Sequence, residues 1–122
     1  MKILVVGYGS IGKRHVKNLL NNSKAEIIIC TKRKNLEFSR KNVKIVNSLD
    51  KALKENPTIG FITNETSYHI QTAIKLAKAG LDLFIEKPLS NSTKGVTTLQ
   101  KIVKEKKLIV QMGFQLRFHK GI

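Results

Sequence analysis

Hydrophobic and polar positions alternate along the chain in blocks of two kinds. Short apolar runs rich in β-branched residues predict buried strands, and longer stretches with apolar residues three or four positions apart predict amphipathic helices. The predicted strands cover residues 2–7, 25–30, 42–46, 58–63, 81–86 and 108–113. The predicted helices cover residues 10–22, 49–56, 67–79 and 92–107. Strand and helix therefore follow one another regularly through the chain.

Each predicted helix has one apolar face, which we expect to pack on a sheet. The inward positions are Ile11, Val16, Leu19 and Leu20 in the first helix, Leu49, Ala52 and Leu53 in the second, Ile70, Ala73, Ile74 and Ala77 in the third, and Val96, Leu99, Ile102 and Val103 in the fourth. Ser48 has the side chain of an N-cap for the second helix, and Gly80 is a natural residue just beyond the third. The strands are short and apolar on both faces, which favours a parallel sheet with helices on both sides.

Composition narrows the class of protein. A chain of 122 residues fits one domain, and 41% hydrophobic with 25% charged residues is typical of a globular protein. No apolar run approaches the roughly 20 residues that span a bilayer. The single cysteine, Cys30, cannot form an internal disulfide and is compatible with a reducing compartment, so we expect a cytoplasmic protein with no membrane partner.

The net charge of +15 admits two interpretations. One is a polyanion partner such as nucleic acid, and the other is a lysine-rich background on solvated faces. The lysines are scattered and outnumber the arginines, whereas nucleic-acid sites favour arginine and clustered basic residues interleaved with aromatics. The sequence also shows no metal-ligand spacing. We therefore expect no nucleic-acid partner, while the basic excess favours anionic cofactors and substrates.

A glycine-rich turn lies between the first strand and the first helix. The segment "VVGYGSIGKRH" places Gly7, Gly9 and Gly12 as G-x-G-x-x-G, with Ser10 and Ile11 at the start of the helix. The first glycine allows a tight turn, the second lets the backbone approach a pyrophosphate, and the third lets the helix pack close to the strand. The helix N-terminus offers N–H groups and a positive dipole end to phosphates. The motif predicts a dinucleotide site, and with it a doubly wound, mainly parallel six-stranded α/β sheet of Rossmann type in the order 3-2-1-4-5-6.

The end of the second strand bears on the choice of dinucleotide. A site for NAD usually has a carboxylate here that binds the ribose 2′-hydroxyl. The stretch "IIICTKRKN" has none, and Thr31, Lys32 and Arg33 offer a hydroxyl and two cations to a 2′-phosphate instead. Lys32 also fits the general lysine background, whereas Arg33 stands out in a chain with few arginines. We therefore expect NADP rather than NAD.

Three later segments make the prediction more specific. "FITNETSYH" ends the fourth strand, "IEKPLS" ends the fifth, and "GFQLRFHKGI" follows the sixth. With "GYGSIGKRH", they resemble the N-terminal domain of the Gfo/Idh/MocA oxidoreductases, the relatives of glucose–fructose oxidoreductase and inositol dehydrogenase. The resemblance implies a nicotinamide cofactor and hydride transfer to or from a sugar, polyol or related carbonyl compound.

The resemblance also implies roles for single residues. Lys87 matches the family's active-site lysine, which touches cofactor and substrate, and Glu86 matches its acidic neighbour near the cofactor ribose. The other matches are Thr63, Asn64 and His69, which flank the cofactor, and Arg117 near the nicotinamide. All lie at carboxyl ends of predicted strands, where doubly wound sheets bind ligands.

Four of these residues have structural alternatives. His69 caps or packs the start of its helix in one interpretation and flanks the cofactor in the other, and the sequence favours neither. Asn64 can be a turn residue, Glu86 a partner of a neighbouring lysine, and Arg117 a surface charge. For Lys87, the E-K-P triplet and the strand-end position agree.

The domain organisation follows from the same resemblance. We expect residues 1–112 to form the dinucleotide-binding domain and residues 113–122 to begin a connection to a substrate and oligomerisation domain outside this chain. The 122-residue chain would then be inactive alone, and the full-length protein a homo-oligomer. The alternative is a complete, non-catalytic module that senses nucleotide or redox state.

Overall fold

A computed structural model describes residues 1–33, 42–64, 68–86 and 95–113. For residues 112 and 113 it describes the backbone alone. The described residues form β1 (Lys2–Val6), α1 (Ser10–Asn22), β2 (Glu26–Cys30), β3 (Val43–Val46), α2 (Leu49–Leu53), β4 (Ile59–Ile62), α3 (His69–Lys78), β5 (Asp82–Glu86), α4 (Val96–Lys106) and β6 (Val110–Gly113).

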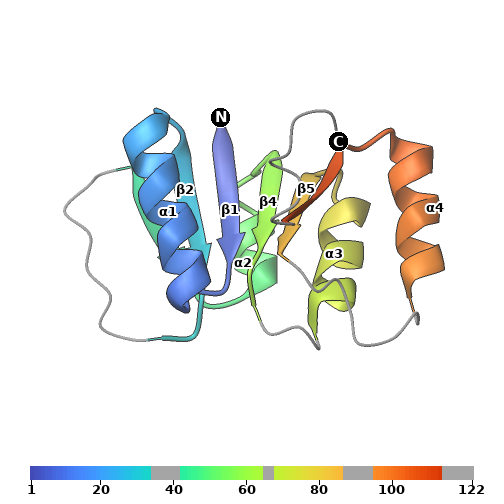
Figure 1. The fold of residues 1–122 in the computed structure, drawn as a ribbon, viewed down its shortest axis with the longest axis horizontal. Coiled ribbons are helices and arrows are strands. Elements are labelled where there is room, and N and C mark those ends of the chain that lie inside the picture. Colours follow the sequence, from blue (N-terminus) through green and yellow to red (C-terminus); the bar gives the residue numbers. More distant parts are fainter. Residues whose placement is uncertain (34–41, 65–67, 87–94, 114–122) are drawn as a thin grey trace.

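The six strands form one sheet in the order β3-β2-β1-β4-β5-β6 (Figure 1). Every neighbouring pair is parallel. The chain runs outward from β1 to β3, returns to β4 on the other side of β1, and then runs outward to β6. This confirms the predicted Rossmann order, and it places the reversal of strand order, where doubly wound folds bind ligands, between β1 and β4.

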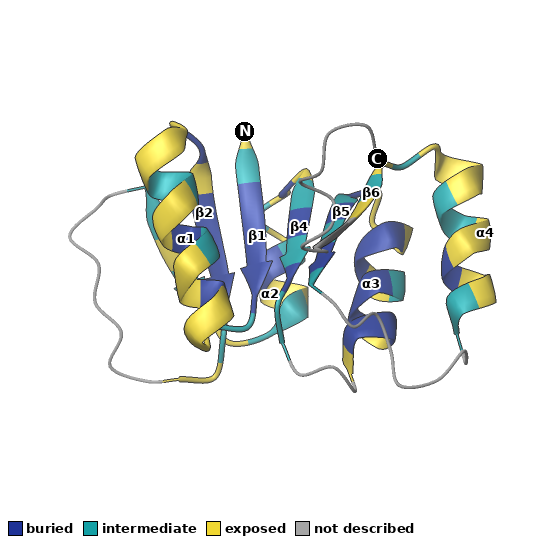
Figure 2. Cartoon of the chain, viewed as in Figure 1, coloured by how far each residue is buried: buried dark blue, intermediate teal, exposed yellow. Residues whose placement is uncertain are grey.

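The two faces of the sheet have separate cores. Leu4, Val6 and their neighbours in β2, β4 and β5 pack with α2, α3 and α4, and Ile3, Val5, Ile27 and Ile29 pack with Val16 of α1. This alternation follows from the two-residue period of a strand. Figure 2 shows the buried residues along β1, β2 and the inner side of α3, with exposed residues on the outer side of α1 and α4.

Both predicted helix caps are confirmed. The Ser48 side chain accepts a hydrogen bond of 3.2 Å from the backbone N–H of Lys51. Gly80 follows the C-cap of α3 with a φ of +88°. A left-handed conformation just beyond a helix is one that glycine adopts without strain.

Three expectations about the helices were wrong. α2 ends at Leu53 rather than residue 56, and Asn56 has a φ of +60°, which no helix continues through. α4 begins at Val96 rather than residue 92, because Gly95 has a φ of +86°. Ile11 does not face the core: it is 37% exposed and lines a cavity at the start of α1 instead. The predicted start of the third helix, at residue 67, lies outside the described residues.

No helix in the part of the chain that the structure describes is both long and apolar enough to cross a membrane.

Candidate functional site

Two glycines of the loop after β1 are required by the protein's own packing. Gly7 has a φ of +93°, and a Cβ there would lie 2.8 Å from the Cα of Asn64. A Cβ at Gly12 would lie 2.4 Å from the carbonyl oxygen of Gly7. Both distances are shorter than any van der Waals contact allows. The close crossing of β1, α1 and the end of β4 therefore depends on these glycines.

Gly9 differs from both. Its φ is −82°, which any residue adopts, and among the described residues a Cβ there would meet no atom within 4 Å. Neither backbone strain nor packing explains a glycine at this position. Open space above a bare backbone is what a closely approaching ligand requires. Gly9 therefore supports the predicted pyrophosphate site on an observation independent of the motif.

The start of α1 borders a cavity. Among the described residues no side chain caps the helix, its first turn has no acidic residue, and the carbonyl of Gly9 accepts from Lys13 N–H at 2.9 Å. A cavity of about 420 Å³ opens here, lined by Gly7, Tyr8, Gly9, Ser10, Ile11, Thr63 and Asn64. The helix N-terminus with its unpaired amides favours an anion in this cavity.

Two further cavities extend from the first along the carboxyl ends of β1, β2 and β3. One, of about 580 Å³, shares Gly7 and Asn64 with the first cavity. The other, of about 310 Å³, shares Thr31, Lys32 and Asn47 with the second. Neighbouring cavities share lining residues, and we call the three together the carboxyl-edge groove. An elongated groove of this kind suits an extended ligand.

The cations predicted to select the cofactor lie at the far end of this groove. Thr31, Lys32 and Arg33 line the third cavity with Lys51 of α2, and no carboxylate is among the described residues that line it. Nη1 of Arg33 donates to the carbonyl of Tyr8 at 2.7 Å, which holds the guanidinium beside the glycine loop. No sequence pattern indicates that Lys51 would join this group, because Lys51 lies on a different element.

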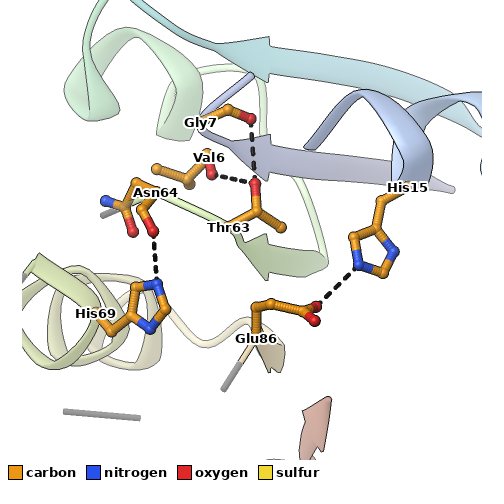
Figure 3. A network of polar contacts seen from close by, with 7 residues as sticks. All are labelled: Val6, Gly7, His15, Thr63, Asn64, His69 and Glu86. Carbon is orange, nitrogen blue, oxygen red and sulfur yellow. Dashed lines mark hydrogen bonds and ion pairs between the residues drawn. The ribbon is translucent and has the colours of Figure 1, made fainter. Parts of the chain in front are cut away.

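The loop after β4 is fixed by hydrogen bonds to β1 and α3 (Figure 3). The Thr63 hydroxyl donates to the Val6 carbonyl at 2.8 Å and lies 3.2 Å from that of Gly7. Nε2 of His69, which is buried at the start of α3, donates to the Asn64 carbonyl at 2.6 Å, because a carbonyl can only accept. These bonds hold Asn64 at the wall of the groove.

The Asn64 side chain has an unused acceptor. Its Nδ2 donates to the Thr72 hydroxyl at 3.1 Å, while its buried Oδ1 has no hydrogen-bond partner in the structure. A buried polar atom without a partner is rare in native proteins. Asn64 lines the first two cavities of the groove, but its Oδ1 is shielded from solvent and is not exposed to a ligand in either cavity.

Glu86, the last residue of β5, contacts a residue that the sequence did not single out. Its Oε2 lies 3.0 Å from Nε2 of His15 on α1, and Figure 3 shows the two side chains pointing toward one another. His15 follows Gly12 closely in the chain, but no local pattern relates it to Glu86, which is 71 residues away. The remaining candidates, Lys87 and Arg117, lie outside the described residues.

Cys30 is not a nucleophile in this site. The thiol is buried at the end of β2, and burial raises its pKa, against the weaker opposing effect of Lys32 and Lys75. It is therefore protonated at neutral pH. Across the described ranges, no cluster of three or more His, Cys, Asp or Glu side chains could hold a metal ion.

Comparison with known proteins agrees with this geometry. A family model described as an oxidoreductase family with an NAD-binding Rossmann fold matches residues 1–114. The chain is 30% identical to scyllo-inositol 2-dehydrogenase (NAD(+)) of Bacillus subtilis over 97% of its own length. It is 29% identical to the inositol 2-dehydrogenase/D-chiro-inositol 3-dehydrogenase of Halalkalibacterium halodurans over 96%. In both cases it spans 36% of the relative.

Solved structures of dehydrogenases are also similar to this chain over nearly its whole length. The chain is similar to myo-inositol 2-dehydrogenase from Lactobacillus plantarum, with a TM-score of 0.83, 29% identity and coverage of 98% of this chain but 38% of that one. A probable dehydrogenase from Thermotoga maritima matches with a TM-score of 0.85, 28% identity and the same coverage. The chain thus corresponds to little more than one third of its relatives.

Proposed function

The chain belongs to the Gfo/Idh/MocA oxidoreductase family, as the NAD-binding Rossmann part, and we propose that it serves a dehydrogenase that acts on a sugar or polyol. The observation that carries the proposal is Gly9. Its missing side chain is explained neither by backbone conformation nor by packing within the described residues, and it faces an uncapped helix start. A dinucleotide explains both features.

The carboxyl-edge groove suggests how the cofactor would lie. Its pyrophosphate would accept hydrogen bonds from the backbone N–H groups of Ser10 and Ile11, at the positive end of α1. Its adenosine half would extend toward Thr31 and Arg33, and its nicotinamide half toward Glu86 at the end of β5. When bound, the cofactor supplies the hydride acceptor or donor.

Residues of the loop after β4 would complete this site. Asn64 would form part of the wall of the cofactor site, since it lines the first two cavities of the groove. His69 and Thr63 would act one step away, since His69 holds the Asn64 backbone and Thr63 ties the loop to β1. Thr63 and His69 would thus keep the wall of the cofactor site in position without contacting the cofactor.

The chemistry at the substrate would fall to Lys87, the residue after Glu86. A hydride transfer at a carbinol carbon requires a proton to leave or reach the substrate oxygen, and a lysine amine beside the nicotinamide is suited to move it. Arg117 would lie near the nicotinamide end. The substrate class follows from inositol dehydrogenases being relatives, and the rest of the substrate pocket, with any subunit interface, would come from a part that this chain does not contain.

We further propose a preference for NADP. Lys32, Arg33 and Lys51 gather around one cavity with the Thr31 hydroxyl, and none of its described lining residues is a carboxylate, an arrangement that suits a 2′-phosphate. The Bacillus subtilis relative is named as NAD(+)-dependent, but at 30% identity its cofactor choice need not carry over.

Titration of the 122-residue chain with NADPH and with NADH, followed by nicotinamide fluorescence, tests both proposals. We expect saturable binding of each, tighter for NADPH. Binding of neither at about millimolar concentration would refute the dinucleotide site. Tighter binding of NADH would leave that site standing and remove the NADP preference.

A further inference from the structure

A histidine on α1 makes a long-range contact that the proposed cofactor site does not explain. His15 lies on the helix that begins at the glycine loop, and its Nε2 lies 3.0 Å from Oε2 of Glu86. A carboxylate can only accept hydrogen bonds, so Nε2 carries the proton and donates. The bond joins the helix of the pyrophosphate loop to the last residue of β5.

Two phenylalanines hold the imidazole in place. The ring centroids of Phe61 and Phe84 lie 5.3 and 5.2 Å from that of His15. The two phenylalanines, which are register partners in β4 and β5, stack on each other at 4.9 Å. His15 and Glu86 are only 19% and 21% exposed, so water competes little for the bond between them. The aromatic rings therefore fix both the position and the direction of the donor.

Stability alone does not account for a histidine at this position. The neighbouring inward positions of α1 are apolar, with Val16 buried and Leu19 packed on the same core. An apolar side chain at position 15 would pack on Phe61 and Phe84 without the desolvation of an imidazole and a carboxylate. The polar pair is better explained by what it does to Glu86.

We propose that His15 is a positioning residue for the nicotinamide half of the site. By holding the Glu86 carboxylate, it would fix the orientation of the acidic group that we propose lies near the nicotinamide half, at the end of β5. This inference rests on the proposed function, because Glu86 and Lys87 have these roles only if a dinucleotide binds. It predicts that His15 affects the nicotinamide half of the cofactor and leaves the adenosine half unchanged.

Two substitutions separate the hydrogen bond from the packing. His15→Phe keeps an aromatic ring against Phe61 and Phe84 but has no donor. His15→Gln places an amide N–H where the imidazole Nε2 was and restores the donor. If His15→Phe does not fold, His15→Leu replaces it as the variant without a donor, and thermal unfolding of each variant identifies that case.

Each variant of the 122-residue chain is titrated with NADPH and with ADP, which reaches only the pyrophosphate and adenosine positions. We expect His15→Phe to weaken NADPH binding about tenfold, the size of one hydrogen bond to a charged group. The affinity of His15→Phe for ADP should stay within about twofold of that of the unaltered chain, a difference of about 0.4 kcal/mol. His15→Gln should recover most of the NADPH affinity.

The outcomes are distinguishable. Equal losses for NADPH and ADP mean that His15 only stabilises α1, and they overturn the inference. Unchanged NADPH affinity in His15→Phe, or no recovery in His15→Gln, overturns it as well. If the unaltered chain binds neither ligand, the proposed function fails and the inference fails with it, whereas a selective loss in His15→Phe supports both.

Discussion

Replacing two glycines of the same loop by alanine should separate folding from ligand binding. At Gly12, a Cβ would lie 2.4 Å from the carbonyl oxygen of Gly7. At Gly9, a Cβ would meet no described atom within 4 Å, and the φ of −82° suits alanine. The added methyl group therefore clashes with backbone at position 12 and points into open space at position 9.

The structure sets the size of each effect. For Gly12→Ala, the obstructing atom belongs to the backbone, so the oxygen must move by more than half an ångström, an overpacking penalty of about 3 kcal/mol. The higher helix propensity of alanine offsets about 1 kcal/mol of this penalty. Gly12→Ala should therefore lower the free energy of unfolding by about 2 kcal/mol. Gly9→Ala should change stability by less than about 0.5 kcal/mol, because alanine restricts the unfolded chain but is a poorer N-cap than glycine for α1.

The assay pairs urea unfolding with titration by NADPH. Gly9→Ala should keep the urea midpoint of the original chain and lose at least about tenfold in affinity, since a methyl group occupies the space that the pyrophosphate approaches. Gly12→Ala should lower the midpoint. A Gly9→Ala variant that binds NADPH normally, or that loses as much stability as Gly12→Ala, would refute this account of the loop.

Three further predictions follow from single contacts. Arg33→Asp should weaken NADPH much more than NADH, while the same charge reversal at exposed Lys101 of α4 should affect neither; equal losses for both dinucleotides would remove Arg33 from 2′-phosphate binding. Thr63→Val, measured by urea unfolding, should destabilise the fold by about 1 kcal/mol through loss of the hydroxyl bond to β1, and unchanged stability would contradict that role. The hydrogen bond from Lys44 lowers the pKa of Glu55 below its usual 4.5, so its stabilising effect is present above that pH and lost as the pH falls through the lowered pKa. Glu55→Gln should therefore reduce the acid sensitivity of unfolding, and an identical pH profile would exclude the effect.

The strand order and the glycine loop were predictable because both depend on local patterns. Apolar runs separated by amphipathic stretches indicate a parallel sheet. G-x-G-x-x-G between the first strand and the first helix indicates that this sheet is of Rossmann type. The ends of helices depend instead on single backbone conformations. Asn56 and Gly95 have positive φ values, which apolar periodicity does not encode, so the predicted helices extended too far.

The contacts that build the site were less predictable than its location. The bond between His15 and Glu86 joins residues 71 positions apart, and only the completed sheet brings them together. Lys51 and Arg33 line one cavity for the same reason. The helical spacing of Ile11 fits the apolar face of α1 and predicts a core position, yet the residue lines the cavity at the start of the helix.

The most direct test of the central claim is an amide NMR titration of the 122-residue chain with ADP. If the carboxyl-edge groove binds a dinucleotide through the start of α1, the largest shifts will belong to the backbone N–H groups of Gly9, Ser10 and Ile11. Smaller shifts are expected at Thr31 and Asn64. Shifts concentrated on the exposed lysines of α4, or no shifts at saturating ADP, would contradict the account.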